Sequence, residues 1–191
     1  MKILFASQNI NKVKEISKLL PAHIEIIGLK DIQFNEEIPE TEPSLEGNAI
    51  LKATHLSKTL DYPIFADDTG LEIDALNGEP GVLSARYGGE DKNAELNMAL
   101  VLSKMSGIKE RKAQFRTVIS LEMNGENHCF EGIVKGEIRE QKSGADGFGY
   151  DPIFQPEGYD VTFAEMSMEE KNKISHRGLA VQKLVDFLKS I

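Results

Sequence analysis

Two long stretches of β-forming residues, 113–123 and 127–138, dominate the middle of the chain. Between them stands Asn124-Gly125, the dipeptide that most strongly favours a two-residue turn between antiparallel strands. Alternate positions of the first stretch would face the core. Those positions are Ala113, Phe115, Thr117, Ile119, Leu121 and Met123. The pattern predicts a long β-hairpin that any fold of this chain must accommodate.

Strand and helix patterns alternate around this hairpin. Residues 2–6 form a short apolar run, and residues 13–20 carry apolar side chains at helical spacing. Residues 63–66 predict a strand, 67–70 an acidic turn and 71–76 another strand. Strand–helix units beside a long hairpin predict an α/β protein with a mixed sheet and flanking helices.

Composition narrows the class of protein. A chain of 191 residues is expected to form one domain, 1–191, with room for two lobes. The formal net charge of -9 argues against a nucleic-acid partner, which requires a broad basic surface. Cys129 is the single cysteine, which suits a reducing compartment. No apolar run is long enough for a signal peptide or a membrane span, so we expect a soluble cytoplasmic protein.

Four polar segments carry chemistry, and the first suits phosphate. Ser7, Gln8, Asn9, Ile10, Asn11 and Lys12 lie between the first strand and the first helix. Backbone N–H groups at a helix start favour an anion, and a lysine adds mobile positive charge. Lys52 stands on a helix that Ser44 can cap. The competing interpretation is an ordinary helix cap with two solvent-exposed lysines, and the segment is not a Walker A loop.

The second segment suits a divalent cation. A nucleoside triphosphate usually carries Mg²⁺, which needs only one or two protein carboxylates. Asp67-Asp68 follows a strand, and Glu40 belongs to an acidic loop. The same carboxylates can orient or deprotonate a water molecule. An aspartate-rich turn without function explains Asp67-Asp68 equally well.

The remaining two segments suit a planar base. Phe148 and Tyr150 offer aromatic faces between the flexible Gly147 and Gly149, and Asp151 can accept ring N–H groups. Lys171, His176 and Arg177 are donors for exocyclic carbonyl oxygens, which favours a 6-oxo purine over adenine. Solvated side chains at a helix start are the alternative for His176 and Arg177.

These segments belong to six motifs that occur in order along nearly the whole chain. They are S-x-N-x-x-K (Ser7 to Lys12), N-A-x-x-K-A (Asn48 to Ala53), F-A-D-D-T-G-L (Phe65 to Leu71), P-G-V-x-S-A-R-Y (Pro80 to Tyr87), G-F-G-Y-D-P-x-F (Gly147 to Phe154) and E-E-K-x-x-I-S-H-R-G (Glu169 to Gly178). With them the chain resembles the Ham1-like family of inosine triphosphate pyrophosphatases, also described as dITP/XTP pyrophosphatases.

The resemblance implies Mg²⁺-dependent hydrolysis of ITP, dITP and XTP to the monophosphate and pyrophosphate. It also implies a homodimer and a two-lobed α/β fold with the substrate cleft between the lobes. By the same resemblance Ser7 to Lys12 and Lys52 would hold the phosphates, while Glu40 and Asp68 would hold Mg²⁺. Asp68 would accept the proton of the attacking water. Substrate would also contact Thr69, Phe148, Gly149, Tyr150, Asp151, Lys171, His176 and Arg177.

One departure from the family pattern stands beside the helix lysine. Many members read E-N-A, whereas Gly47 precedes Asn48 here and the acid is Glu46. The metal contact of that glutamate is therefore open, and Arg86 has no assigned role. Two other functions compete: a nucleotide sensor without catalysis, and a phosphatase or pyrimidine-specific pyrophosphatase. The three carboxylates Glu40, Asp67 and Asp68 count against the sensor.

Overall fold

A computed structural model describes residues 1–34, 36, 38–60 and 62–191. Residues 35 and 37 of the acidic loop lie outside the described residues. The chain divides into two compact units. Unit 1 comprises Met1–Asp68, Thr117–Gly132 and Arg177–Ile191, and unit 2 comprises Thr69–Arg116 and Ile133–His176.

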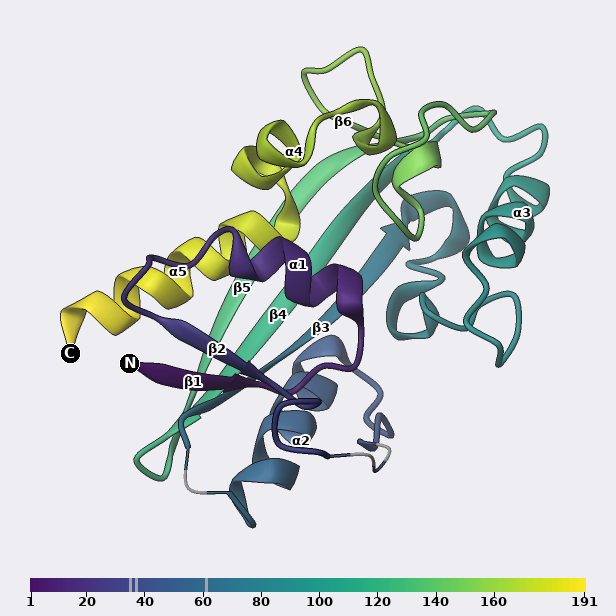
Figure 1. Cartoon of the computed structure of the whole chain (residues 1–191). Helices are drawn as coiled ribbons and strands as arrows, with labels where there is room; N and C mark the ends of the chain where they lie inside the picture. Colours follow the sequence, from purple (N-terminus) through teal and green to yellow (C-terminus); the bar gives the residue numbers. More distant parts are fainter. Residues whose placement is uncertain (35, 37, 61) are drawn as a thin grey trace. The chain divides into compact units, whose positions relative to one another are not determined.

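The strands of the described residues form a six-stranded sheet in the order β2-β1-β3-β4-β5-β6 (Figure 1). Their bounds are β1 (Lys2–Phe5), β2 (Glu25–Gly28), β3 (Ile64–Ile73), β4 (Lys112–Met123), β5 (Glu126–Ile138) and β6 (Phe154–Pro156). β1 runs parallel to β2 and β3, whereas β5 and β6 are antiparallel. The predicted mixed α/β sheet is therefore confirmed.

The helices are α1 (Ile10–Ser17), α2 (Leu45–Ser57), α3 (Ala94–Lys104), α4 (Met168–Ile174) and α5 (His176–Ser190). Short 3₁₀ turns are η1 (Asp74–Leu76), η2 (Gly81–Leu83), η3 (Asp151–Ile153) and η4 (Phe163–Glu165). Among the described residues, every helix falls short of the length and apolar character that a membrane crossing requires.

The predicted hairpin is confirmed. β4 and β5 are neighbours, and Asn124 and Gly125 between them both have positive φ, 55° and 78°. A two-residue turn with positive φ at both positions matches the twist of the strands it joins. Asparagine and glycine adopt this conformation at low cost, which is why the dipeptide is informative.

Unit 1 packs helices on both faces of its strands. Ile3, Phe5 and Phe65 face a cluster built with α1 and α5. Leu4, Ile64 and Ala66 face a second cluster built with α2. Because successive side chains of a strand point to opposite faces, this alternation follows directly from the strand geometry.

The prediction of an acidic turn at 67–70 is wrong. β3 continues from Ile64 to Ile73 without interruption, so the two predicted strands are one. Asp67 and Asp68 are 2% and 7% exposed, and they lie within the strand. The turn preference of Asp-Asp-Thr-Gly is local, whereas buried cations from the helices of unit 1 stabilise these carboxylates in extended backbone.

Candidate active site

The alternation of β3 sends its two aspartates to opposite faces of the strand. Asp68 follows Ile64 and Ala66 toward α2, and Asp67 follows Phe65 toward α1 and α5. Burial of an ionised carboxylate is unfavourable unless a cation and hydrogen bonds compensate it. Cations on both faces of unit 1 supply that compensation.

On the α2 face, Asp68 belongs to a compact polar cluster. Lys52 Nζ donates to Asp68 Oδ1 at 2.8 Å and to Glu40 Oε1 at 2.9 Å. Asn48 Nδ2 lies 3.4 Å from Asp68 Oδ2, and Asn48 Oδ1 accepts the Glu42 N–H at 2.9 Å. Asn48 and Lys52 are four residues apart on α2, so they share one face of the helix. Lys52 is therefore a buried member of the cluster and not a solvent-exposed lysine.

The charges of this cluster influence each other's protonation. Burial raises the pKa of Asp68 above its ordinary value, because it outweighs the opposing effect of Lys52 and Lys12. Burial works against the charged form of Lys52 as well, but the Asp68 and Glu40 carboxylates outweigh it and raise the pKa of that ammonium. Asp68 is thus a more basic carboxylate than an exposed aspartate, beside a fixed positive charge.

On the other face, Asp67 joins α1 and α5. Lys12 Nζ lies 3.0 Å from Asp67 Oδ1, and Arg177 Nε lies 3.4 Å from Oδ2. Arg177 also donates from Nη1 to Oε2 of the buried Glu15. Burial alone would raise the pKa of Asp67, but Lys12 and Arg177 outweigh it and hold this pKa at about 2. Burial is also the main reason that the pKa of Lys12 is lowered.

The predicted phosphate segment forms a capped helix start. Asn9 is the N-cap of α1, and its Oδ1 accepts the N–H groups of Asn11 at 3.0 Å and Lys12 at 3.3 Å. Asn9 N–H donates to Ser7 Oγ, and Gln8 Nε2 donates to the Glu36 carbonyl. Ile10 and Asn11 are exposed. The cap thereby fixes where Lys12 leaves the helix, and its ammonium is directed at Asp67 rather than at solvent.

Glu40 and Asp68 are the carboxylates that the sequence predicted for a divalent cation. Both carboxylates contact one ammonium, that of Lys52. Two carboxylates directed at a single cation fit Mg²⁺, which completes its shell with water and phosphate oxygens. A larger group of three or more His, Cys, Asp or Glu side chains suited to a metal is absent from the residues that the structure describes.

Glu46, whose role the family pattern left open, is exposed in the first turn of α2. Its charge acts on the thiol of Cys129, whose pKa is raised first by burial and then by this glutamate. The presence of glycine at position 47 has a steric explanation, because a Cβ there would lie 2.7 Å from the Glu42 Cβ. The glycine therefore permits close approach of the acidic loop to α2.

In unit 2, Asp151 organises the predicted base segment. Its Oδ2 accepts the Phe148 N–H at 2.8 Å and the Lys171 ammonium at 2.7 Å. Lys171 Nζ lies 4.9 Å from the centre of the half-buried Phe148 ring, within cation–π range. Gly147 has φ +78°, and a Cβ there would lie 2.2 Å from Asp151 Oδ2. Only glycine therefore allows this loop to close on the carboxylate.

His176 and Arg177 are adjacent in sequence but make contacts in different units. His176 is 3% exposed, and its ring stacks on Phe115 with centroids 4.5 Å apart and planes 15° apart. Phe163 lies 6.3 Å from the same ring. Arg177 is buried between Glu15 and Asp67 in unit 1. The sequence grouped these two donors together, but their side chains contact different sets of residues.

The other predicted residues of unit 2 are half-buried or buried. Thr69 is half-buried within β3, and Gly149 is half-buried with φ +63°. Tyr150 is 5% exposed, and its hydroxyl donates to the Ser84 carbonyl at 2.8 Å. Tyr150 therefore packs into the core, while Phe148 keeps a partly open face.

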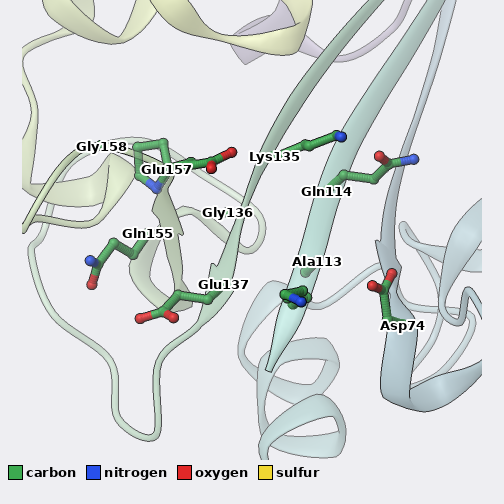
Figure 2. Close-up of a pocket in the computed structure, with 11 residues that line it drawn as sticks. Asp74, Ala113, Gln114, Lys135, Gly136, Glu137, Gln155, Glu157 and Gly158 are labelled. Carbon is green, nitrogen blue, oxygen red and sulfur yellow. The ribbon is translucent and has the colours of Figure 1, made fainter. Parts of the chain in front are cut away.

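A pocket of unit 2 lies away from these residues. A pocket of about 680 Å³ opens over β4, β5 and β6, where Lys135 and Gln114 project from neighbouring strands (Figure 2). Its charged lining combines Asp74, Glu137 and Glu157 with Lys112 and Lys135. None of the residues predicted for the nucleotide lines it, so it does not belong to the candidate active site.

Sequence reasoning missed four residues that support the site. Glu15 is the buried partner of Arg177, and Asn48 supports Asp68. Phe115 and Phe163 surround the His176 ring. Asn48 had a detectable signal, because it opens the motif that contains Lys52. Phe115 had none, because strand alternation already explained it as a core residue, and nothing in the sequence singled out Glu15 or Phe163.

We predict that Asp67→Asn lowers stability and removes part of its pH dependence. The folded-state pKa of about 2 lies below the ordinary value of 3.8. The ionised carboxylate therefore stabilises the fold fully above pH 4, and this contribution is lost as the pH falls toward 2. Urea unfolding at pH 7 should show a loss of about 2 kcal/mol or more. The loss should diminish toward pH 3.

The exposed Asp186 of α5 provides the matched control. Asp186→Asn removes the same charge and should change the free energy of unfolding by less than about 0.5 kcal/mol. An Asp67→Asn protein as stable as the wild type at pH 7 would contradict the buried ion pairs.

Comparisons with known proteins agree with this architecture. The model of the Ham1 family matches residues 3–187. The dITP/XTP pyrophosphatase of Flavobacterium johnsoniae is 57% identical over 188 residues, which cover 98% of both chains. The dITP/XTP pyrophosphatase of Bacillus subtilis is 44% identical over 191 residues, covering 98% of this chain and 96% of that protein.

Two solved structures share the fold over its full length. The Ham1 protein of Staphylococcus aureus has a TM-score of 0.90 and 42% identity, covering 100% of this chain and 99% of that one. A HAM1 protein from Coxiella burnetii has a TM-score of 0.91 and 38% identity, with both chains covered completely. The resemblance inferred from six short motifs is confirmed, and this chain belongs to the Ham1 family.

Proposed function

We propose that this protein hydrolyses deaminated purine nucleoside triphosphates, namely ITP, dITP and XTP, to the monophosphate and pyrophosphate. The observation that carries the proposal is the Asp68 cluster: a buried carboxylate of raised pKa that shares the Lys52 ammonium with Glu40. The printed names of the Flavobacterium and Bacillus relatives, dITP/XTP pyrophosphatase, support the substrate class. Such an activity would remove damaged purines from the nucleotide pool.

Positive charge in unit 1 would receive the triphosphate. Lys12 and Lys52 are held in defined positions by Asp67 and Asp68, so their ammonium groups are preorganised. Preorganised charges stabilise a phosphoryl-transfer transition state without reorganisation during the reaction. The start of α1, residues Ser7 to Asn11, would add hydroxyl, amide and backbone donors.

Glu40 and Asp68 would hold Mg²⁺, and their common approach to the Lys52 ammonium fits this assignment. When bound, the ion would neutralise phosphate charge. Asp68 would take the proton of the water that attacks the α-phosphorus. A carboxylate with a raised pKa is a better general base than an ordinary aspartate, and burial provides this property here.

Unit 2 would bind the base. Phe148 offers a partly open aromatic face, while Asp151 and Lys171 form a buried pair beside it. Stacking on Phe115 fixes the plane of the His176 ring, and a ring N–H in that plane could donate to a 6-oxo group. Adenine presents a donor at that position. Each buried donor that then faces another donor costs about 1–3 kcal/mol, which would discriminate against ATP.

The assembly and location follow from the resemblance as further proposals. We expect a homodimer in the cytoplasm, without nucleic-acid partners. The net charge of -9 is consistent with a small-molecule substrate recognised by local clusters of lysine rather than by a basic surface.

The reaction itself is tested with the purified wild-type protein. Incubation with ITP, XTP, ATP and GTP, with and without Mg²⁺, should yield IMP or XMP and pyrophosphate far faster than AMP. Chromatography identifies the products. Release of orthophosphate, or tight ITP binding without turnover, would contradict the proposed reaction.

Asp68→Asn should abolish turnover while ITP still binds. The amide keeps the size of the side chain but removes its basicity, and loss of a general base costs typically 10²–10⁴-fold in rate. Steady-state assays give the rate, and calorimetry gives the affinity for ITP. Near-wild-type turnover would remove Asp68 from the proton transfer.

His176→Phe should reduce the preference for ITP over ATP. Phenylalanine retains an aromatic ring against Phe115 but lacks the ring nitrogens. We expect the ratio of kcat/KM values for ITP and ATP to fall roughly ten-fold, as for the loss of one buried polar contact. An unchanged ratio would mean that other groups read the 6-position.

A further inference from the structure

The motif from Pro80 to Tyr87 has no role in the functions described above, yet it lies along the second half of β3. β1 pairs with β3 only at Ile64 and Phe65. Farther along, the Ile73 N–H donates to the Glu79 carbonyl at 3.2 Å, and Glu72 forms a bridge with Pro80. The segment from 79 onward therefore takes the place of a neighbouring strand within unit 2.

Two glycines allow this segment to approach closely. A Cβ at Gly70 would lie 2.7 Å from the Gly81 carbonyl oxygen. Gly81 itself has φ +53°, a conformation that glycine adopts readily. The glycine of the Thr69-Gly70-Leu71 segment is thus explained by backbone packing against the Pro80–Tyr87 motif.

Ser84 lies where these segments meet, and it is only 7% exposed. Its hydroxyl accepts the Leu71 N–H at 2.9 Å and donates to the Gly81 carbonyl at 2.6 Å. Its carbonyl accepts the Tyr150 hydroxyl at 2.8 Å and the Asn97 Nδ2 amide at 3.3 Å. One residue therefore connects β3, helix α3 and the segment that contains Phe148 and Asp151.

Tyr150 is the residue through which Ser84 contacts the predicted base segment. It stands between Phe148, which offers the open aromatic face, and Asp151, which accepts from Phe148 N–H and Lys171. Burial is the first cause that raises the pKa of the Tyr150 phenol, so the hydroxyl remains a donor at neutral pH. The phenol is therefore in the protonated form that donates to the Ser84 carbonyl.

We propose that Ser84 is a positioning residue for base recognition, acting through the Tyr150 hydroxyl on the loop that presents Phe148 and Asp151. This inference rests on the proposed function and adds a specificity role to the Pro80–Tyr87 motif. Ser84 would touch no substrate atom. It would instead restrict the conformations of this loop before the nucleotide binds. Binding would then lose less conformational entropy, which favours affinity.

Tyr150→Phe tests the connection directly, because it removes one hydroxyl and leaves the ring. The Ser84 carbonyl keeps the Asn97 amide as a donor, so no buried acceptor is stranded. We expect KM for ITP to rise roughly three- to ten-fold, the effect of one neutral hydrogen bond. We expect kcat to change by less than about two-fold, because the contact does not involve the reacting phosphate. Inhibition by inorganic tripolyphosphate, which lacks a base, should be unchanged.

Tyr87→Phe is the matched control. Its hydroxyl lies in the same motif but bonds to Glu79 and Lys104 on the exposed side of unit 2. This variant should keep the wild-type KM for ITP. Ser84→Ala keeps the carbonyl that Tyr150 contacts but removes the hydroxyl that holds this residue to Leu71 and Gly81. It should therefore raise KM in the same direction as Tyr150→Phe, and the KM of the double variant should be close to that of the more affected single variant.

The outcomes separate the inference from the proposed function. A wild type that hydrolyses ITP, together with an unchanged KM in Tyr150→Phe, would overturn the inference alone. If Tyr150→Phe weakened the binding of ITP and of tripolyphosphate equally, the inference would also be overturned. The variant would then have disturbed the site as a whole and not the recognition of the base. A wild type that neither binds nor hydrolyses ITP would overturn the proposed function and the inference with it.

Discussion

The burial of two consecutive aspartates within β3 is the constraint on which the candidate site of unit 1 depends. A strand directs them to opposite faces, so one partner cannot neutralise both. Lys52 stabilises Asp68 from α2, whereas Lys12 and Arg177 stabilise Asp67 from α1 and α5. Removal of one partner from a buried ion pair costs about 3–5 kcal/mol, so helices and strand are mutually dependent. The same pairs hold the lysine ammonium groups in place for phosphate.

Unit 2 applies the same principle with a single carboxylate. Asp151 is 2% exposed, and it accepts from Lys171 and from the Phe148 backbone. A charge-assisted hydrogen bond is stronger than a neutral one, and here it fixes the loop that carries the aromatic face. Gly147 makes the closure possible, because any Cβ would collide with the carboxylate. The rigidity of the predicted base segment thus comes from one buried charge.

Local signals predicted most elements but failed where charge burial decided the backbone. The hairpin was predictable because Asn124-Gly125 satisfies a local requirement for positive φ. Asp67 to Gly70 also carried a local turn signal, yet this segment is extended, because partners distant in sequence stabilise the ionised side chains. For the same reason Lys12 and Lys52, which look like solvated helix lysines in the sequence, are buried ion-pair partners.

Most strands and helices, the family and the chemical types gathered for a nucleotide were predictable from the sequence. These depend on periodicity, turn residues and motifs, which are local. Tertiary packing was needed to establish that Arg177 contacts Asp67, 110 residues away, while His176 stacks on Phe115. It also decided that Ser84 joins Tyr150, 66 residues away. A buried charge or hydroxyl needs a partner, but any suitable residue can supply it, so packing alone selects which one does.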